Sequence, residues 1–451
     1  MRPHDLFRRL LLSALLALAA ARLLGFVVRF GERSLQADFA AYYTAGEALN
    51  RGLSPYQTHS RIEPPVWDGV SRYRHSRFLY PPLVATLFRP WALLPYHVAK
   101  HLWMVLSLAA VAAALVATGR ALGLGRRAAL GTALWACLFH PLLTLLERGQ
   151  IDAMTLLLVA FALTAFVRSG DSLRAGVLLG AATLLKLNVA FFLPFLLATR
   201  RWRAVAGYVG TLLGLSVISL AVDGREAVTA YVRGELPRIA ANGEGGPSEL
   251  LLPPEELADL RQGTGVADAP KDGRVYAREA FGFVANASLA RVMASWTGRR
   301  GENPLTGRMA LGLGLGLLLV ITAARPAAGG WSPTGSALYW HAVMVAVLIC
   351  GPLTWVMNLV WLLPVGLLLW RESGAVASPG PAAACAGTVG LLLASLPDRH
   401  AFPLLSPYGG AILDYQYVMA EVLVVGALVG LLWRRGAGSA GVPPLPAPRA
   451  A

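Results

Sequence analysis

The sequence predicts an all-α protein, a polytopic bundle of about twelve transmembrane helices that includes short ones. Composition is the first reason: 56% of the 451 residues are hydrophobic, only 14% are charged, and the mean hydropathy is +0.55. Since an ordinary soluble domain has about 25% charged residues, this composition excludes a soluble fold. The second reason is that apolar runs long enough, or nearly so, to cross a ~30 Å hydrocarbon layer recur along the chain.

The first apolar run, 10–30, follows Arg2, Arg8 and Arg9. It is too long for a secretory signal and no small-residue cleavage site ends it, so we interpret it as a transmembrane helix with the N-terminus in the cytoplasm. Further runs lie at 97–118, 128–146, 150–167, 203–222, 307–323, 335–351, 357–370, 381–396 and 415–433.

The stretch 175–199 is predicted to form two short helices that meet at Lys186 and Asn188. As a single span it would place Arg200 and the arginines after it outside, against the excess of basic residues that marks cytoplasmic loops. Two short helices return these arginines to the cytoplasm, on the same side as the other arginine clusters between apolar runs. Both termini are then cytoplasmic.

The net charge of +15, from 40 Lys and Arg against 25 Asp and Glu, would suggest nucleic acid in a soluble chain. Because the arginines lie in short clusters between apolar runs, we interpret them as cytoplasmic anchors and expect membrane lipids, and no nucleic acid, as partners. The cysteines, Cys137, Cys350 and Cys385, lie inside apolar runs. We expect buried thiols there, with neither a disulfide framework nor a metal site.

This topology places two long hydrophilic segments, 31–80 and 223–306, on the outer face. Polar loops gathered over a helical bundle are where a binding site is expected. Residues 1–435 are predicted to form one membrane domain. Residues 436–451, rich in Pro, Ala and Gly, are predicted to be a disordered cytoplasmic tail.

Asp38 is the first candidate for chemistry, because it stands a few residues beyond the first apolar run, where membrane meets water. A carboxylate held there accepts a proton from a hydroxyl if its pKa and reach suit. An aspartate that precedes a helical stretch is also a common N-cap. Spacing alone leaves both interpretations open.

A dense polar turn, 147–152, separates two apolar runs. It can be a solvated hairpin. Alternatively, Gln150 and Asp152 face inward and bind hydroxyls, while Arg148 meets a phosphate. Asn358 lies at a later outer turn, where it can form hydrogen bonds but cannot titrate.

Lys186 is the most informative single residue, because the chain has only three lysines and this one lies within an apolar run. An ionisable group at such depth indicates a functional role. A lysine at the end of a short helix can also extend its ammonium group to the membrane surface. Both interpretations remain open from the sequence.

Other motifs are weaker or missing. Asn286-Ala287-Ser288 matches a glycosylation acceptor, a three-residue pattern that chance often produces. The sequence has no glycine-rich phosphate loop ending in Gly-Lys-Ser/Thr, no His-Glu-x-x-His and no paired-cysteine motif. Neither nucleotide hydrolysis nor zinc chemistry is therefore indicated.

Taken together, these segments resemble glycosyltransferase family 87, a group of polytopic enzymes in the GT-C superfamily. The resemblance is carried, in chain order, by Asp38-Phe39 through Pro55-Tyr56, Tyr80-Pro81-Pro82, Gly149-Gln150, Gly176 to Gly180 leading to Lys186 and Arg201-Trp202-Arg203, and Asn286-x-Ser288-Leu289. One segment departs from the family. Members commonly show Ser-Pro-x-Ser-Trp-x-His-His at a late outer turn, and here Met357 and Asn358 stand in place of both histidines.

The resemblance implies a GT-C-like integral membrane glycosyltransferase of a bacterial inner (cell) membrane, with its active site on the outer face. The donor would be a polyprenyl-phosphate-linked sugar, with mannose the expected hexose, and the acceptor a glycan or glycolipid of the envelope. In the family the acidic residue of the first outer loop is the proposed general base, which places that role on Asp38. The residues expected to bind substrate or donor are Lys186, Arg148, Gln150, Arg77, Tyr80, Asn286 and Asn358. Because the donor is already activated, no cofactor and no metal are expected.

Two other functions stay open. A lipid or sugar transporter or flippase would favour broken helices with ionisable groups in the membrane, and the split at Lys186 is such a feature. A non-catalytic family relative is the other, since the two histidines are absent and fold similarity does not establish function. The glycosyltransferase interpretation predicts that Asp38, Lys186, Gln150 and Asn286 converge on one cavity.

Overall fold

The structure is a computed structural model that describes residues 3–33, 36–56, 66–67, 70–71, 78–237, 239, 287–289, 292–293, 304–323, 333–351, 354–373, 381–397 and 406–437. Its helices, in chain order, are α1 (Pro3–Arg33), α2 (Ala37–Asn50), α3 (Pro82–Phe88), η2 (Trp91–Leu93), α4 (Tyr96–Ala121), α5 (Arg126–Leu138), α6 (His140–Arg148), α7 (Asp152–Ser169), α8 (Leu173–Leu185), η3 (Leu187–Phe191), α9 (Phe192–Ala198), α10 (Trp202–Val222), α11 (Gly224–Ala230), η4 (Tyr231–Glu235), α16 (Pro304–Ala323), α17 (Pro333–Cys350), η7 (Val356–Trp361), α18 (Leu362–Ser373), α19 (Pro381–Ser395) and α20 (Ser406–Ala437).

The described chain is all-α apart from one antiparallel pair of two-residue strands. β1 (Val66–Trp67) pairs with β2 (Val70–Ser71), with Val66 opposite Ser71. Every predicted apolar run contains helix, and the predicted split near Lys186 is confirmed. α8 ends at Leu185, Lys186 is extended (φ −151°, ψ 109°), and η3 and α9 follow.

The apolar helices fit a multi-pass membrane protein. Among the described residues, the helices long and apolar enough to cross a membrane are Leu10–Glu32, Tyr96–Ala121, Asp152–Ser169, Trp202–Val222 and Tyr415–Arg434. Segments of α5 and α6, bent by 57° at their junction, add one more if they form a single span. The predicted count of about twelve is not confirmed. The other apolar segments among the described residues are only 10–17 residues long, short of the ~20 that cross a bilayer: Leu173–Leu185, Leu187–Ala198, Leu311–Ala323, Gly335–Cys350 and Ala382–Ser395.

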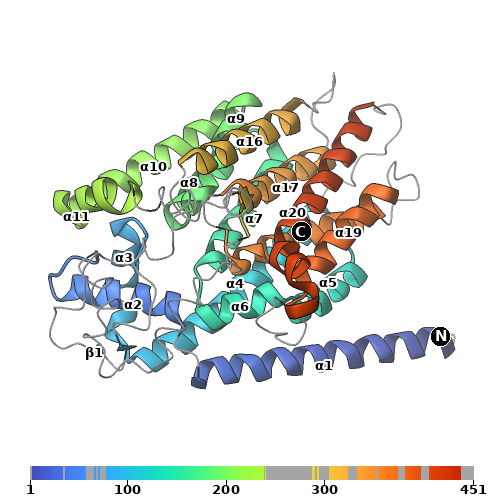
Figure 1. The fold of residues 1–451 in the computed structure, drawn as a ribbon, viewed down its shortest axis with the longest axis horizontal. Helices are drawn as coiled ribbons and strands as arrows, with labels where there is room; N and C mark the ends of the chain where they lie inside the picture. The colour runs from blue at the N-terminus through green and yellow to red at the C-terminus, as the bar shows by residue number, and fades with distance from the viewer. Residues whose placement is uncertain are drawn as a thin grey trace.

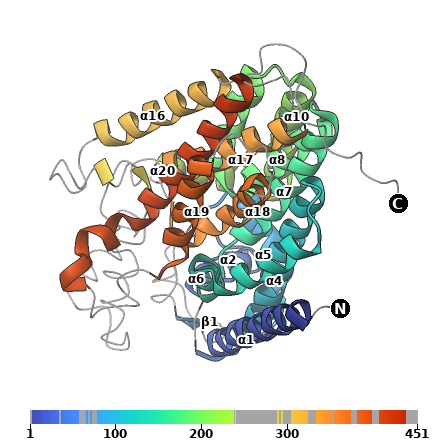
Figure 2. The ribbon, with the colours of Figure 1, turned by 90° about the vertical axis from the view of Figure 1, so that its right-hand side faces the viewer.

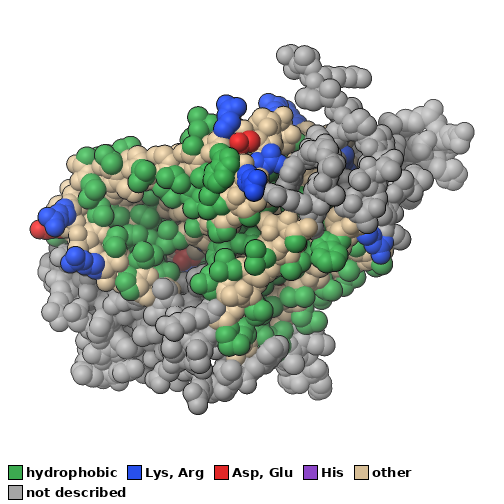
Figure 3. All heavy atoms as spheres, turned by 90° about the horizontal axis from the view of Figure 1, so that it is seen from above, with side chains coloured by type: hydrophobic (Ala, Val, Ile, Leu, Met, Phe, Trp, Pro, Cys, Tyr) green, Lys and Arg blue, Asp and Glu red, His purple; other side chains and the backbone are tan. Residues whose placement is uncertain are grey.

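The helices gather into one bundle. α1 lies along one edge of the bundle, against α4, α5 and α6 (Figures 1 and 2). α2, α3, β1 and α11 lie together at the end where α1 finishes, far from the N-terminus (Figure 1). Seen from above, apolar side chains cover much of the described surface and an acidic side chain lies in a recess (Figure 3). An apolar exterior of this kind is what a lipid environment requires.

Glycines allow α8 and α10 to pack at close range. A Cβ atom added at Gly176 would lie 1.9 Å from the carbonyl oxygen of Ala204, and one at Gly207 would lie 2.3 Å from that of Leu173. Small residues are typical of helix interfaces in membranes, because they let the backbones approach. This contact holds α8, and with it the Lys186 break, against the bundle.

The predicted outer segment 31–80 is not simply a loop. Its residues 37–50 form α2, most of which is buried. An aromatic cluster holds α2 in place: the Phe39 ring lies 5.7 Å from Trp103 and 5.8 Å from Tyr96, and the Tyr42 ring lies 5.0 Å from Phe88. Such aromatic pairs each add about 0.5–1.5 kcal/mol beyond the area that they bury. Most of segment 223–306, and residues 438–451 of the predicted tail, lie outside the described residues.

Candidate functional site

Asp38 lies in the first turn of α2 and forms a buried ion pair with Arg148. Arg148 Nε donates to Asp38 Oδ2 at 2.7 Å and Nη2 donates to Oδ1 at 3.0 Å, and the two side chains are 15% and 8% exposed. A bidentate pair of this geometry is among the stronger protein hydrogen bonds, and it fixes the orientation of the carboxylate. The N-cap interpretation of Asp38 is wrong, because the N-cap of α2 is Gln36.

Arg148 reaches Asp38 because α6 ends there. Gly149 follows in the left-handed region (φ 68°), and a Cβ atom at this position would lie 2.6 Å from that of Phe39. Trp103 Nε1 donates to the Gly149 carbonyl oxygen at 2.8 Å, and Gln36 Nε2 donates to that of Leu146 at 3.1 Å. A glycine is needed here both for the positive φ and for the close approach of α2.

Gln150 is the centre of a hydrogen-bonded cluster next to this ion pair. Tyr42 donates its hydroxyl to Gln150 Oε1 at 2.9 Å and lies 2.9 Å from the Tyr80 hydroxyl, which is itself 3.4 Å from Gln150 Oε1. Burial raises the pKa of both tyrosine hydroxyls well above the usual value. Both phenols therefore stay protonated and can serve as hydrogen-bond donors.

Asp152 forms the second buried ion pair, with Lys186. Lys186 Nζ lies 2.5 Å from Asp152 Oδ2, and the two side chains are 12% and 0% exposed. Asn358 Nδ2 donates to the same oxygen at 2.9 Å, and Trp355 N donates to Asn358 Oδ1 at 2.6 Å. The ammonium group of Lys186 is thus paired inside the protein, with the carboxylate in the first turn of α7.

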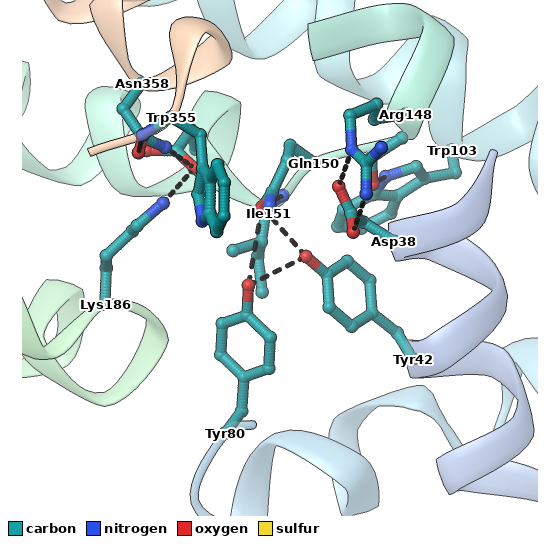
Figure 4. Close-up of polar contacts among 12 residues, drawn as sticks. Asp38, Tyr42, Tyr80, Trp103, Arg148, Gln150, Ile151, Lys186, Trp355 and Asn358 are labelled. Atoms are coloured by element: carbon teal, nitrogen blue, oxygen red, sulfur yellow. Dashed lines mark hydrogen bonds and ion pairs between the residues drawn. The ribbon is translucent and has the colours of Figure 1, made fainter. Parts of the chain in front are cut away.

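The two ion pairs stand on either side of the Gln150 cluster. Figure 4 shows Asp38 and Arg148 on one side, Lys186, Trp355 and Asn358 on the other, and the hydroxyls of Tyr42 and Tyr80 directed between them. The single turn 148–152 contributes to all three groups. The solvated-hairpin interpretation of this turn is wrong, because Gln150 and Asp152 are buried.

Aromatic contacts extend from this cluster toward α11. The Tyr56 hydroxyl donates to the Tyr80 carbonyl oxygen at 2.6 Å, and its ring lies 6.1 Å from the ring of Tyr231. Tyr231 opens the π-helical turn η4. These contacts connect the end of the bundle formed by α2 with the segment that follows α10.

The structure brings together most of the residues that the sequence singled out. Asp38, Arg148, Tyr80, Gln150, Lys186 and Asn358 all belong to the arrangement above. Arg77 and Asn286 lie outside the described residues. Next to Asn286 in the chain, Ala287 N donates to the carbonyl oxygen of Thr354 at 2.5 Å, beside the turn that carries Asn358.

Neither Tyr42, nor Trp103, nor the pairing of Asp152 with Lys186 was predicted from the sequence. Tyr42 is four residues after Asp38, a spacing that places both on one face of a helix, and this signal was readable. The contacts of Trp103 and Asn358 join segments far apart in the chain, so no local sequence pattern predicts them.

Comparison with known proteins gives the family. The model of glycosyltransferase family 87 matches residues 78–322, which is more than half of the chain. The chain belongs to glycosyltransferase family 87. The resemblance seen in the sequence is therefore confirmed. The match covers Tyr80, the turn 148–152 and Lys186, whereas Asp38 and Asn358 lie outside it.

Two curated relatives carry the same name, polyprenol-phosphate-mannose-dependent α-(1-2)-phosphatidylinositol pentamannoside mannosyltransferase. The protein from Mycolicibacterium smegmatis is 26% identical over 302 residues, which are 66% of this chain and 61% of the relative. The protein from Mycobacterium tuberculosis is 32% identical over 154 residues, which are 33% of this chain and 35% of the relative. The matched part of the chain thus spans less than two thirds of the length of either relative.

Proposed function

We propose that the chain is an integral membrane glycosyltransferase that transfers a hexose, with mannose the first choice, from a polyprenyl phosphate donor. The acceptor is a hydroxyl of an envelope glycan or glycolipid on the outer face of a bacterial cell membrane. One observation carries this proposal. In a family 87 membrane protein, a buried carboxylate (Asp38) and a buried ammonium group (Lys186) flank a cluster of hydroxyl and amide groups. The names of the two relatives support the donor and the acceptor class.

Asp38 is the proposed general base. Its carboxylate takes the proton of the acceptor hydroxyl while that oxygen attacks the anomeric carbon, and the bond from this carbon to the phosphate oxygen breaks with inversion. A carboxylate has about four acceptor positions, so the bidentate contact with Arg148 does not by itself fill it. Arg148 fixes the orientation of this carboxylate.

Lys186 is the proposed partner of the leaving phosphate. Negative charge grows on the phosphate as the sugar departs, and a fixed cation in a site with little water lowers the barrier. The break between α8 and η3 places the Lys186 ammonium group beside Asp152 and Asn358. Arg148 is less suited to this role, since it donates from both Nε and Nη2 to the carboxylate of the proposed base, whereas Lys186 makes one such contact, with Asp152. The donor carries an activated sugar, so the proposed step needs neither a nucleotide nor a metal.

An Asp38→Asn variant tests the base assignment. Losing a general base commonly slows a reaction by about 10²–10⁴-fold, so transfer of labelled mannose from polyprenyl phosphate in membranes should fall by that factor. Asp171→Asn is the matched control: Asp171 accepts hydrogen bonds from Arg203 N and Ala204 N, remote from Asp38. This variant should transfer sugar at nearly the parental rate.

Three results would contradict the proposal. If an Asp38→Asn variant inserts normally and transfers sugar at the parental rate, Asp38 is not the general base. Movement of the intact lipid-linked sugar across vesicles without cleavage of the sugar-phosphate bond would instead identify a transporter, the class that the helix break at Lys186 favours. Absence of both reactions, with an envelope defect on deletion, would identify a non-catalytic relative.

A further inference from the structure

Asp152 is a buried carboxylate whose two oxygens are bonded unequally. Oδ2 receives Lys186 Nζ at 2.5 Å and Asn358 Nδ2 at 2.9 Å. Oδ1 is equally buried and has no hydrogen-bond partner among the described residues. The residue as a whole is 0% exposed, so water at the surface does not compensate.

A buried acceptor without a partner is costly, and a charged one more so. Most buried polar atoms in proteins are hydrogen-bonded to protein or ordered water, and exceptions call for an explanation in terms of function or a bound group. Asp152 lies in the first turn of α7, and this helix end supplies no partner for Oδ1. The position of Oδ1 is therefore suited to a hydrogen-bond donor from outside the chain.

The chemistry of the neighbours indicates which donor fits. An ionised carboxylate only accepts hydrogen bonds, so Oδ1 selects an O–H or N–H group. Lys186 has three N–H donors on its ammonium group and uses one on Asp152, which leaves donors for an anion. A ligand that presents an anion and hydroxyl groups within one small unit satisfies both residues, and a hexosyl phosphate is such a unit.

We propose that Asp152, Lys186 and Asn358 form the subsite for the sugar phosphate of the donor. Lys186 binds the phosphate, and Asp152 Oδ1 accepts a hydrogen bond from one ring hydroxyl of the transferred hexose. Asn358 holds Asp152 through Oδ2, so that Oδ1 stays directed at the sugar. This inference rests on the proposed function and adds to it the residue that recognises the sugar.

The arrangement makes Asp152 a determinant of sugar specificity. A site built to bind a hydroxyl discriminates strongly against the analogue that lacks it, because a buried polar group is then left without a partner. Among the 2-, 3-, 4- and 6-deoxy forms of the mannosyl donor, one should therefore be a much poorer substrate. A hydrogen bond to a charged group is worth about 1.5–3 kcal/mol, so we expect kcat/KM to fall about 10- to 100-fold for that form.

The experiment measures transfer from mannosyl polyprenyl phosphate and its four deoxy forms by the parent, Asp152→Asn and Asp171→Asn. In Asp152→Asn, the one strongly penalised deoxy form should be used almost as well as the mannosyl donor, since the contact is already weakened. Asp171→Asn should keep the parental penalty. If Asp152→Asn does not fold, Asn358→Ala leaves the ion pair in place and should reduce the same penalty.

The outcomes separate this inference from the function on which it rests. If the parent transfers mannose and Asp152→Asn lowers kcat/KM equally for all five donors, the glycosyltransferase stands and Asp152 only supports the fold. A parent with no preference among the deoxy forms overturns the inference as well. If the parent cleaves none of the donors, the proposed function fails and the sugar subsite fails with it.

Discussion

At the scale of single residues, the site is built from charges that are buried in pairs. Asp38 with Arg148 and Asp152 with Lys186 are each held within hydrogen-bond distance, and neither carboxylate is open to solvent. A buried pair is a poor source of net stability, because removing two ions from water costs nearly what their attraction returns. Their retention in this membrane protein is better explained by chemistry than by stability.

Removing only one member of a buried ion pair is expected to destabilise the protein. In Arg148→Met the Asp38 carboxylate stays buried without its bidentate partner, and breaking such a pair costs about 3–5 kcal/mol. We expect a clearly lower thermal denaturation temperature for the purified protein in detergent. The double variant Arg148→Met with Asp38→Asn removes the charge too and should regain at least half of the loss. A double variant less stable than Arg148→Met would contradict this account.

Part of this site was predictable at the residue scale. Lys186 was identified because a cation inside an apolar run is rare, and Asp38 because it follows the first span and matches the family segment. What the sequence does not state is which charge pairs with which. The bidentate contact of Arg148 with Asp38, rather than with a phosphate, follows from where α6 stops and how α2 packs.

At the scale of elements, the site depends on the start of α7 lying beside the end of α8. α7 begins at Asp152 and α8 ends at Leu185, so the carboxylate and the ammonium group meet where the two helices turn. The position of α8 is fixed by its close packing on α10, through Gly176, Gly180 and Gly207. A substitution that disturbs this packing should therefore displace Lys186 and lower activity.

Alanine substitutions at two glycines of α10 test this dependence. A Cβ atom at Gly207 would lie 2.3 Å from the Leu173 carbonyl oxygen, so Gly207→Ala must push α10 away from α8. We expect this to lower the free energy of unfolding by about 1–3 kcal/mol. Gly210→Ala on the same helix meets nothing within 4 Å and should be neutral or slightly stabilising. The thermal denaturation temperature in detergent and the rate of sugar transfer should both fall in Gly207→Ala, and neither should fall in Gly210→Ala. Equal behaviour of the two would show that the close contact does not matter.

The elements were predictable where hydropathy and charge agreed. The break at Lys186 followed from the arginines after residue 199, which a single span would have placed on the wrong side. α2 was missed as a packed element, because its sequence is mixed in polarity and looks like part of a hydrophilic loop. Its burial comes from aromatic contacts with α3 and α4, which are tertiary and leave no periodic pattern.

At the scale of the whole molecule, the polar site lies toward one end of the bundle and several arginines lie at the other. Asp38 lies in the first turn of α2, and Asp152 begins α7. Arg168 lies at the end of α7 and Arg174 at the start of α8, away from the helix ends that carry Asp152 and Leu185, and Arg120 lies at the end of α4. By the positive-inside rule, this asymmetry predicts that the site faces outward. The number of spans could not be read from hydropathy alone, because several apolar helices are too short to cross a bilayer alone.

Single cysteines at the two ends of α4 test the orientation, in a background that lacks Cys137, Cys350 and Cys385. Leu93 is 77% exposed just before α4, and a side chain at Gly125, just after it, would meet nothing within 4 Å. A membrane-impermeant maleimide on intact cells should label Leu93→Cys and spare Gly125→Cys, while permeabilised cells should show both labelled. The reverse pattern would place Asp38 and Lys186 on the cytoplasmic side, where an outer-face acceptor could not reach them.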